Sequence, residues 1–202
     1  MLGFVIVHMA GNLMAFAGHA VFNGYARLLR ELGSPALPES GLLWVARIVV
    51  ASALVIHLFA HAYIMLHPTI PSRLAWSDVM PPWYATLPLS VLQASGALIA
   101  LFVVYHLAQL TIGAVHPAFI AGDAYQNTMV ALRFWPVSVA YIGAAAAVGI
   151  HLLPGLWTAS RSLGLIRPST AVLARWLAPV VALGVAVGLS AVPIAVLTGL
   201  LT

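Results

Sequence analysis

The sequence predicts an all-α integral membrane protein, a five transmembrane helix bundle that forms one domain over residues 1–202. Its composition is far too apolar for a soluble domain, since 63% of the 202 residues are hydrophobic and only 6% are charged, with a mean hydropathy of +1.06. Several apolar runs also reach the ~20 residues that a helix needs to cross a bilayer. These runs are continuous, whereas the strands of a membrane barrel would alternate in polarity.

The apolar runs predict helices at about residues 1–20, 42–66, 86–115, 129–160 and 171–200. Proline and glycine residues separate them, which is typical of the loops between spans. Only seven residues precede His8 in the first run, about 10 Å of helix, which is too short to reach the middle of a ~30 Å hydrocarbon core from the far side. We therefore expect the native first helix to begin before Met1.

The rare residue types exclude several kinds of site. Cysteine is absent, so the chain holds no disulfide, no thiolate zinc site and no cysteine-ligated iron–sulfur cluster of its own. The eight basic residues are all arginines, scattered along the chain, and they form no basic stripe for nucleic acid. Among residues that can bind a metal or a haem iron, histidine is the abundant one left in the apolar runs.

Four successive predicted helices each carry a histidine within the apolar run, at His8, His57, His106 and His151. Polar side chains are unfavourable in hydrocarbon and usually functional there. His57, His106 and His151 each lie about nine residues before the end of their helix, roughly 14 Å from its exit side. Because successive helices alternate in direction, His8 and His106 fall in one layer and His57 and His151 in the other. Two layers with two imidazoles each are what two bis-histidine haems across a bilayer require.

Other residues give weaker signals. His61 lies one turn after His57, and we expect it beside the ligand, bonded to a haem propionate, a quinone oxygen or water. Arg47, Arg73 and Arg161 are candidates to pair with propionates, although each also fits a solvated charge at a helix end. Small residues, including Gly96 and Gly149, fit a close approach to a porphyrin but equally the ordinary packing of membrane helices.

In four stretches the chain resembles the cytochrome b membrane-anchor subunit of type B succinate dehydrogenases and fumarate reductases. They are GFVIVHMAGNL around His8, GLLWVARIVVASALVIHLFAHAY around His57, LQASGALIALFVVYHLAQLTIGAVHPAF around His106 and VGIHLLPGLWTASRSLG around His151. With the loop GDAYQNTMVALRF they cover most of residues 4–164. The histidine followed by GLW is the most specific part, and the last helix has no motif.

The resemblance implies two haem b groups, held by His57 with His151 near the partner subunits and by His8 with His106 near the opposite face. It also implies that flavoprotein and iron–sulfur subunits oxidise succinate on the cytoplasmic side of the cell inner membrane. Electrons would then pass through the haems to menaquinone or another quinone, and the chain alone would not act on succinate. A higher oligomer of the whole complex is compatible with this family.

Other functions remain open on the sequence alone. A different di-haem cytochrome b, the anchor of a formate dehydrogenase, hydrogenase or nitrate reductase, shares the four-histidine design. A non-redox transporter, or a metal enzyme using His57 and His61, is less favoured, because no acidic residue lies within any predicted helix. The quinone site is also open. Its candidates are Ser72, Arg73 and Trp76 at one end of the bundle and Tyr25, Glu31 and Asp123 at the other.

Overall fold

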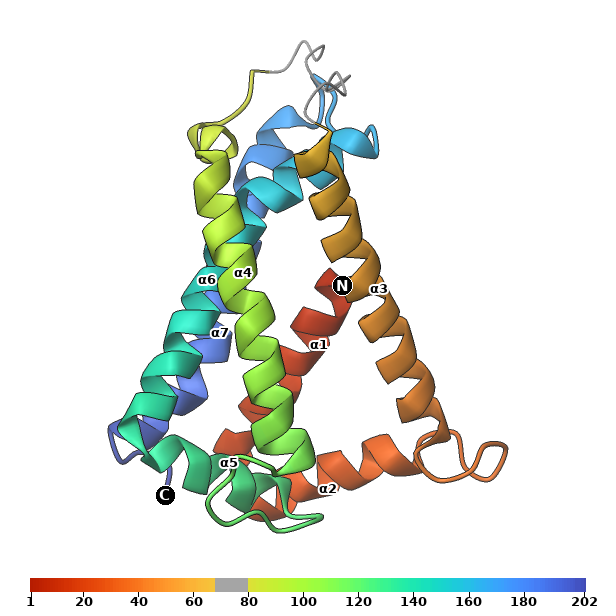
Figure 1. Ribbon diagram of the computed structural model, residues 1–202, viewed down its shortest axis with the longest axis vertical. Helices are drawn as coiled ribbons and strands as arrows, with labels where there is room; N and C mark the ends of the chain where they lie inside the picture. The colour runs from red at the N-terminus through yellow and green to blue at the C-terminus, as the bar shows by residue number, and fades with distance from the viewer. Residues whose placement is uncertain (68–79) are drawn as a thin grey trace. The chain divides into compact units, whose positions relative to one another are not determined.

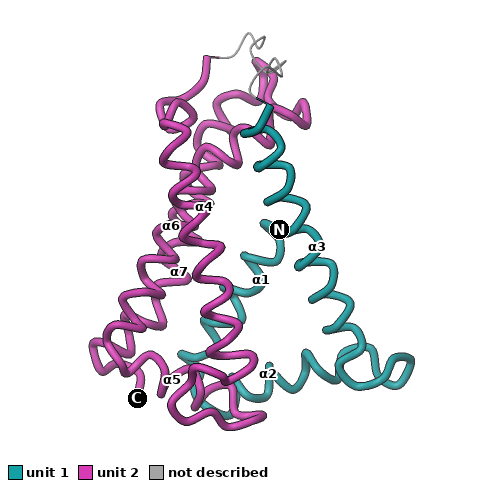
Figure 2. Tube along the Cα trace, viewed as in Figure 1, with its two compact units in different colours: residues 1–75 teal, residues 76–202 magenta. Residues whose placement is uncertain are grey.

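The computed structural model describes residues 1–67 and 80–202. Contacts divide the chain into two compact units, unit 1 over Met1–Ala75 and unit 2 over Trp76–Thr202, coloured teal and magenta in Figure 2. Each unit is described by itself below. The single domain expected from the sequence stays a prediction. Arg73 and the quinone-site candidates Ser72 and Trp76 lie outside the described residues.

The described residues fold into helices, and four of these are long and apolar enough to cross a membrane. They are α3 (Gly41–Leu66), α4 (Leu89–His106) continued by the π-helix η4 (Leu107–Ile112), α6 (Trp135–Ser162) and α7 (Ala171–Leu197). The chain is therefore a multi-pass membrane protein by length and composition of its helices. The count of five spans is not confirmed, because the apolar stretch Leu2–Ala17 is shorter than the other four.

Unit 1 begins with α1 (Leu2–Leu13) and the short 3-10 helix η1 (Met14–Ala17). The helix ends there because Gly18 adopts φ +87°, which L side chains rarely take. A second helix, α2 (His19–Glu31), follows where the sequence predicted only a loop (Figure 1). Tyr25 of α2 lies against α1, where a Cβ on Gly11 would come within 2.8 Å of its ring. The long helix α3 then completes the unit, and within it no α3 residue is buried.

Unit 2 is built around α6, against which both α4 and α7 pack. Figure 1 shows α6 and α7 side by side along their length. Gly149 makes this approach possible, because a Cβ there would lie 2.9 Å from Ala186 Cβ and 3.2 Å from the main-chain oxygen of Ala182. Here the small residue serves helix packing, the ordinary role of glycine in membrane bundles.

A further helix, α5 (Ala124–Arg133), precedes α6, so the predicted span of 129–160 begins too early. Asp123 caps α5 by accepting a hydrogen bond from the Gln126 amide at 2.9 Å. The chain then breaks at Phe134, whose backbone is extended, and α6 starts with a proline in its first turn. The buried Ser138 hydroxyl donates to the Leu132 carbonyl at 2.6 Å and ties the two helices together.

At the other end of unit 2, the 3-10 helix η3 (Trp83–Thr86) packs on α6 and α7. Tyr84 lies edge-on to Trp157, with ring centroids 6.4 Å apart, in a cluster that includes Ala171 and Ala178. Its hydroxyl donates to the Arg175 carbonyl at 2.8 Å. These contacts pack η3, which precedes α4, against α6 and the first turns of α7.

Candidate functional site

The best-defined candidate residue is His151, which lies partly buried on α6 against α4. Its Nδ1 is 3.2 Å from the hydroxyl of Ser95, and that hydroxyl donates to the Leu92 carbonyl at 3.0 Å. The ring rests on Gly96, where a Cβ would come within 3.3 Å of its Cε1. The absence of a side chain at Gly96 therefore lets the His151 imidazole lie close to α4.

His106, at the end of α4, has comparable surroundings. Its Nδ1 is 3.1 Å from the hydroxyl of Tyr141 on α6. Tyr141 donates to Gln109 Oε1 at 2.9 Å, and Gln109 Nε2 donates to the Tyr105 hydroxyl at 2.9 Å. Phe102 stacks on the His106 ring at 5.8 Å between centroids and meets Tyr141 edge-on. The imidazole is thus held from the side by an aromatic ring and at one nitrogen by a hydroxyl.

The two predicted ligand histidines of unit 2, His106 and His151, lie at different levels of the packed helices. His106 is level with Tyr141, and His151 is ten residues further along α6, a rise of roughly 15 Å. On α4 the corresponding contacts, Ser95 and His106, are eleven residues apart, a similar rise.

The predicted histidines of unit 1 occupy different surroundings. His8 is partly buried on α1, and Phe4 of the same helix stacks on it at 5.3 Å between centroids. His57 and His61 lie one turn apart on α3 with exposed side chains. The structure therefore shows only the surroundings of these three residues within unit 1. The pairing of His8 with His106 and of His57 with His151 stays a prediction.

The two described arginines proposed for propionates, Arg47 and Arg161, lie near helix ends. Arg47 is in the second turn of α3, with its Cζ 4.9 Å from the centroid of the Trp44 ring. Arg161 is in the last turn of α6, where a positive charge is favourable to the helix dipole. Their role toward propionates stays a prediction.

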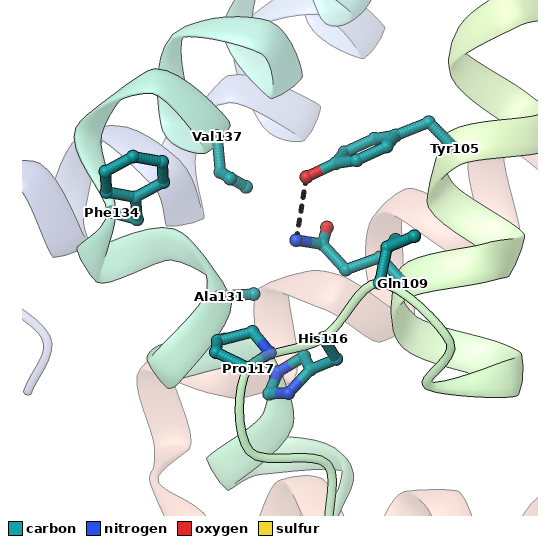
Figure 3. A pocket seen from close by; sticks show the side chains of 8 residues that line it. Tyr105, Gln109, His116, Pro117, Ala131, Phe134 and Val137 are labelled. Carbon is teal, nitrogen blue, oxygen red and sulfur yellow. Dashed lines mark hydrogen bonds between the residues drawn. The ribbon is translucent and has the colours of Figure 1, made fainter.

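A pocket of about 510 Å³ opens beside Tyr105 and Gln109 in unit 2 (Figure 3). Figure 3 shows the hydrogen-bonded Tyr105 hydroxyl and Gln109 amide pointing toward each other at its edge. The rest of the lining is largely apolar and comes from the loop after η4, from α5 and from the start of α6. It consists of Val115, His116, Pro117, Ala131, Phe134 and Val137.

The loop that closes this pocket is fixed by hydrogen bonds of two residues. His116 Nε2 donates to the Asn127 carbonyl at 2.8 Å, and its Nδ1 accepts from the Ala118 amide at 3.0 Å. The Asn127 side chain bonds both the amide and the carbonyl of Ile120 at 2.8 Å. His116 therefore uses both ring nitrogens to hold the loop, and the pocket wall is built from a fixed segment.

The residues that surround His106 and His151 were not identified from the sequence. Ser95, Tyr141 and Gln109 are polar residues inside apolar helices, which is the signal that could have found them. Of the predicted quinone-site candidates, Asp123 caps α5, Tyr25 packs on Gly11 and Glu31 ends α2, and their role toward a quinone stays a prediction. Within the described part of the chain, no three His, Asp or Glu side chains gather as a metal-binding group.

Comparisons with protein-family models, with curated proteins and with solved structures find no match for this chain.

Proposed function

We propose that the chain is the di-haem cytochrome b membrane anchor of a succinate dehydrogenase or fumarate reductase, passing electrons from an iron–sulfur subunit to menaquinone or another quinone. The observation that carries the proposal is the pair of partly buried histidines on α4 and α6. They lie roughly 15 Å apart along the helices, each with Nδ1 beside a hydroxyl. Neutral imidazole is the usual axial ligand of b-type haem, so the donor set fits the group.

In this proposal His106 and His151 each hold one haem iron, and a bound haem supplies one-electron transfer. The second ligands are His8 and His57, a pairing that comes from their depth in the sequence and from the family resemblance. The apolar stretch Leu2–Ala17 is then the fifth span. Ser95, Gly96, Tyr141 and Phe102 orient the two rings, because they contact them from the neighbouring or the same helix.

The pocket beside Gln109 is the proposed quinone site. Its volume of about 510 Å³ and largely apolar lining suit a ring with an isoprenoid tail. The Tyr105 hydroxyl accepts from Gln109, so its own hydrogen is available to a quinone oxygen. The pocket also lies next to the residues that contact His106, which is a favourable place for electrons to leave the protein.

The partners follow from what the chain lacks. Without cysteine it has no ligands for an iron–sulfur cluster, so electrons from succinate must reach it from other subunits. We propose flavoprotein and iron–sulfur subunits on the cytoplasmic side of the cell inner membrane. Mass spectrometry of the copurifying subunits would separate this anchor from that of a formate dehydrogenase, hydrogenase or nitrate reductase.

The proposal is tested by haem quantification and reduced-minus-oxidised spectra of the purified complex. We expect two b haems per chain, with one lost in His106→Ala and the other lost in His151→Ala. His19→Ala is the matched control, because His19 lies at the start of α2 outside the long apolar helices. One haem or none in the unaltered protein, or both haems retained in the two variants, would contradict the assignment.

A further inference from the structure

The hydrogen bonds of Ser95 determine where the ring proton of His151 lies. A serine hydroxyl has one hydrogen and two lone pairs. The Ser95 hydrogen is donated to the Leu92 carbonyl, which has no hydrogen to give back. With that hydrogen on Leu92, the Ser95 oxygen accepts in the 3.2 Å contact with His151, and we assign the ring proton to Nδ1 of the imidazole. In a neutral ring the lone pair is then on Nε2.

The same accounting applies to His106 through different residues. The Tyr141 hydrogen is donated to Gln109 Oε1, so the Tyr141 oxygen accepts from Nδ1 of His106. In this orientation Gln109 Nε2 donates to the Tyr105 hydroxyl, which continues the chain of hydrogen bonds from His106 through Tyr141 to Tyr105. Gln109 is 1% exposed, so water does not compete for these bonds. His106 is thereby also held with its lone pair on Nε2.

We propose that Ser95 and Tyr141 are positioning residues, each of which holds one haem-ligand histidine in the tautomer that presents Nε2 to the iron. The inference rests on the proposed function for the haems, and the observations behind it are hydrogen bonds within unit 2. A hydrogen bond at the second ring nitrogen fixes the orientation of a ligand histidine and raises its basicity. Two unrelated residue types reach this result on two levels of the bundle.

The Nδ1-protonated form also occurs at His67, whose Nδ1 donates to the Tyr63 carbonyl at 2.9 Å at the exposed end of α3. His116 has the opposite pattern, since its Nε2 donates to a carbonyl and its Nδ1 accepts from an amide. His116 and the two predicted ligand histidines of unit 2 thus carry their ring protons on different nitrogens.

The test compares Tyr141→Phe and Ser95→Ala in the intact complex, with the two haems distinguished by the spectra of His106→Ala and His151→Ala. Loss of the acceptor lowers ligand basicity, so we expect the midpoint potential of the His106 haem to rise in Tyr141→Phe. That haem should also dissociate roughly 10–100-fold faster to a haem-scavenging protein. Ser95→Ala should change only the His151 haem, and Ser95→Thr, which keeps the hydroxyl, should restore it.

Tyr63→Phe on α3 and Ser162→Ala at the end of α6 are matched controls that should leave both potentials unchanged. Unchanged potentials and haem dissociation in haem-loaded Tyr141→Phe and Ser95→Ala would overturn the inference while leaving the proposed function intact. Equal changes of both haems in each variant would also overturn it, because they would indicate general loosening. If one variant fails to assemble, the other decides. Absence of haem from the unaltered complex would instead refute the proposed function.

Discussion

Helices α3 and α6 are both long, apolar and histidine-bearing, yet they differ in how they are packed within their own units. In unit 2, α6 buries several small residues and Trp157 between α4 and α7. In unit 1, α3 buries none of its residues, although its mean hydropathy is the higher of the two. Glycine occurs three times within α6, whereas in α3 it occurs only as the first residue. Apolar content thus places a helix in a membrane, while small residues let it pack on its neighbours.

The largest expected effect comes from filling the contact between α6 and α7. Gly149→Leu adds a side chain where even a Cβ would lie 3.2 Å from the Ala182 oxygen. We expect the free energy of unfolding to fall by about 3 kcal/mol, the upper part of the range for overpacking. Ala51→Leu on an exposed position of α3 is the matched control and should change it by less than ~0.5 kcal/mol. Thermal unfolding in detergent measures the change in stability of both variants. Equal losses would contradict the difference in packing between α6 and α3.

A smaller effect is expected from a buried hydroxyl. Ser138→Ala removes the hydrogen bond to the Leu132 carbonyl and should lower the free energy of unfolding by about 1 kcal/mol. Ser52→Ala on α3 makes the same chemical change at an exposed position and should be close to neutral. Denaturant titration measures the free energy of unfolding of the two variants. A larger loss in Ser52→Ala would show that α3 has packing which unit 1 alone does not display.

The smallest effect concerns Tyr84 in η3, outside the long helices. Burial raises the pKa of its hydroxyl above the ordinary value near 10, and the positive charge of Arg175 opposes part of this shift. Because the pKa is higher in the folded state, the stabilisation is present below pH ~10 and is lost as the pH rises through the folded value.

The difference in unfolding free energy between the unaltered protein and Tyr84→Phe should therefore shrink above pH ~10. Tyr63→Phe is the control, because that side chain on α3 is 58% exposed, and its effect at pH 8 should be the smaller of the two. A difference that stays constant from pH 8 to pH 11 would contradict the expected titration of Tyr84.

The long helices could be predicted from sequence because hydropathy reports directly on them. The prediction of 42–66 matches α3 within one residue, and 171–200 matches α7 within a few. The two shorter helices α2 and α5 were missed, because they mix polar and apolar residues and a search for apolar runs passes over them. A signal for α5 was present, since Asp123 and Gln126 have the spacing of a helix N-terminus.

The candidate site was predictable only in part for a different reason. The histidines stand out because they are polar residues in apolar runs. Their acceptors, Ser95 and Tyr141, come from a neighbouring helix, so identifying them requires the register of α4 against α6. That register depends on close packing of many side chains, and hydropathy contains no information about it.

The π-helix η4 makes the length of the chain after His106 as important as its composition. Its wider turns run from Leu107 to the left-handed Gly113, between the histidine and the loop that walls the pocket. Removing one residue there would favour a regular α-helix and rotate every following position by about 100°. Gln109 would then leave either Tyr105 or Tyr141, although no residue type in the network had changed. A deletion between His106 and Gln109 would thus break the hydrogen-bond network, whereas most substitutions at the exposed positions of η4 leave it as it is.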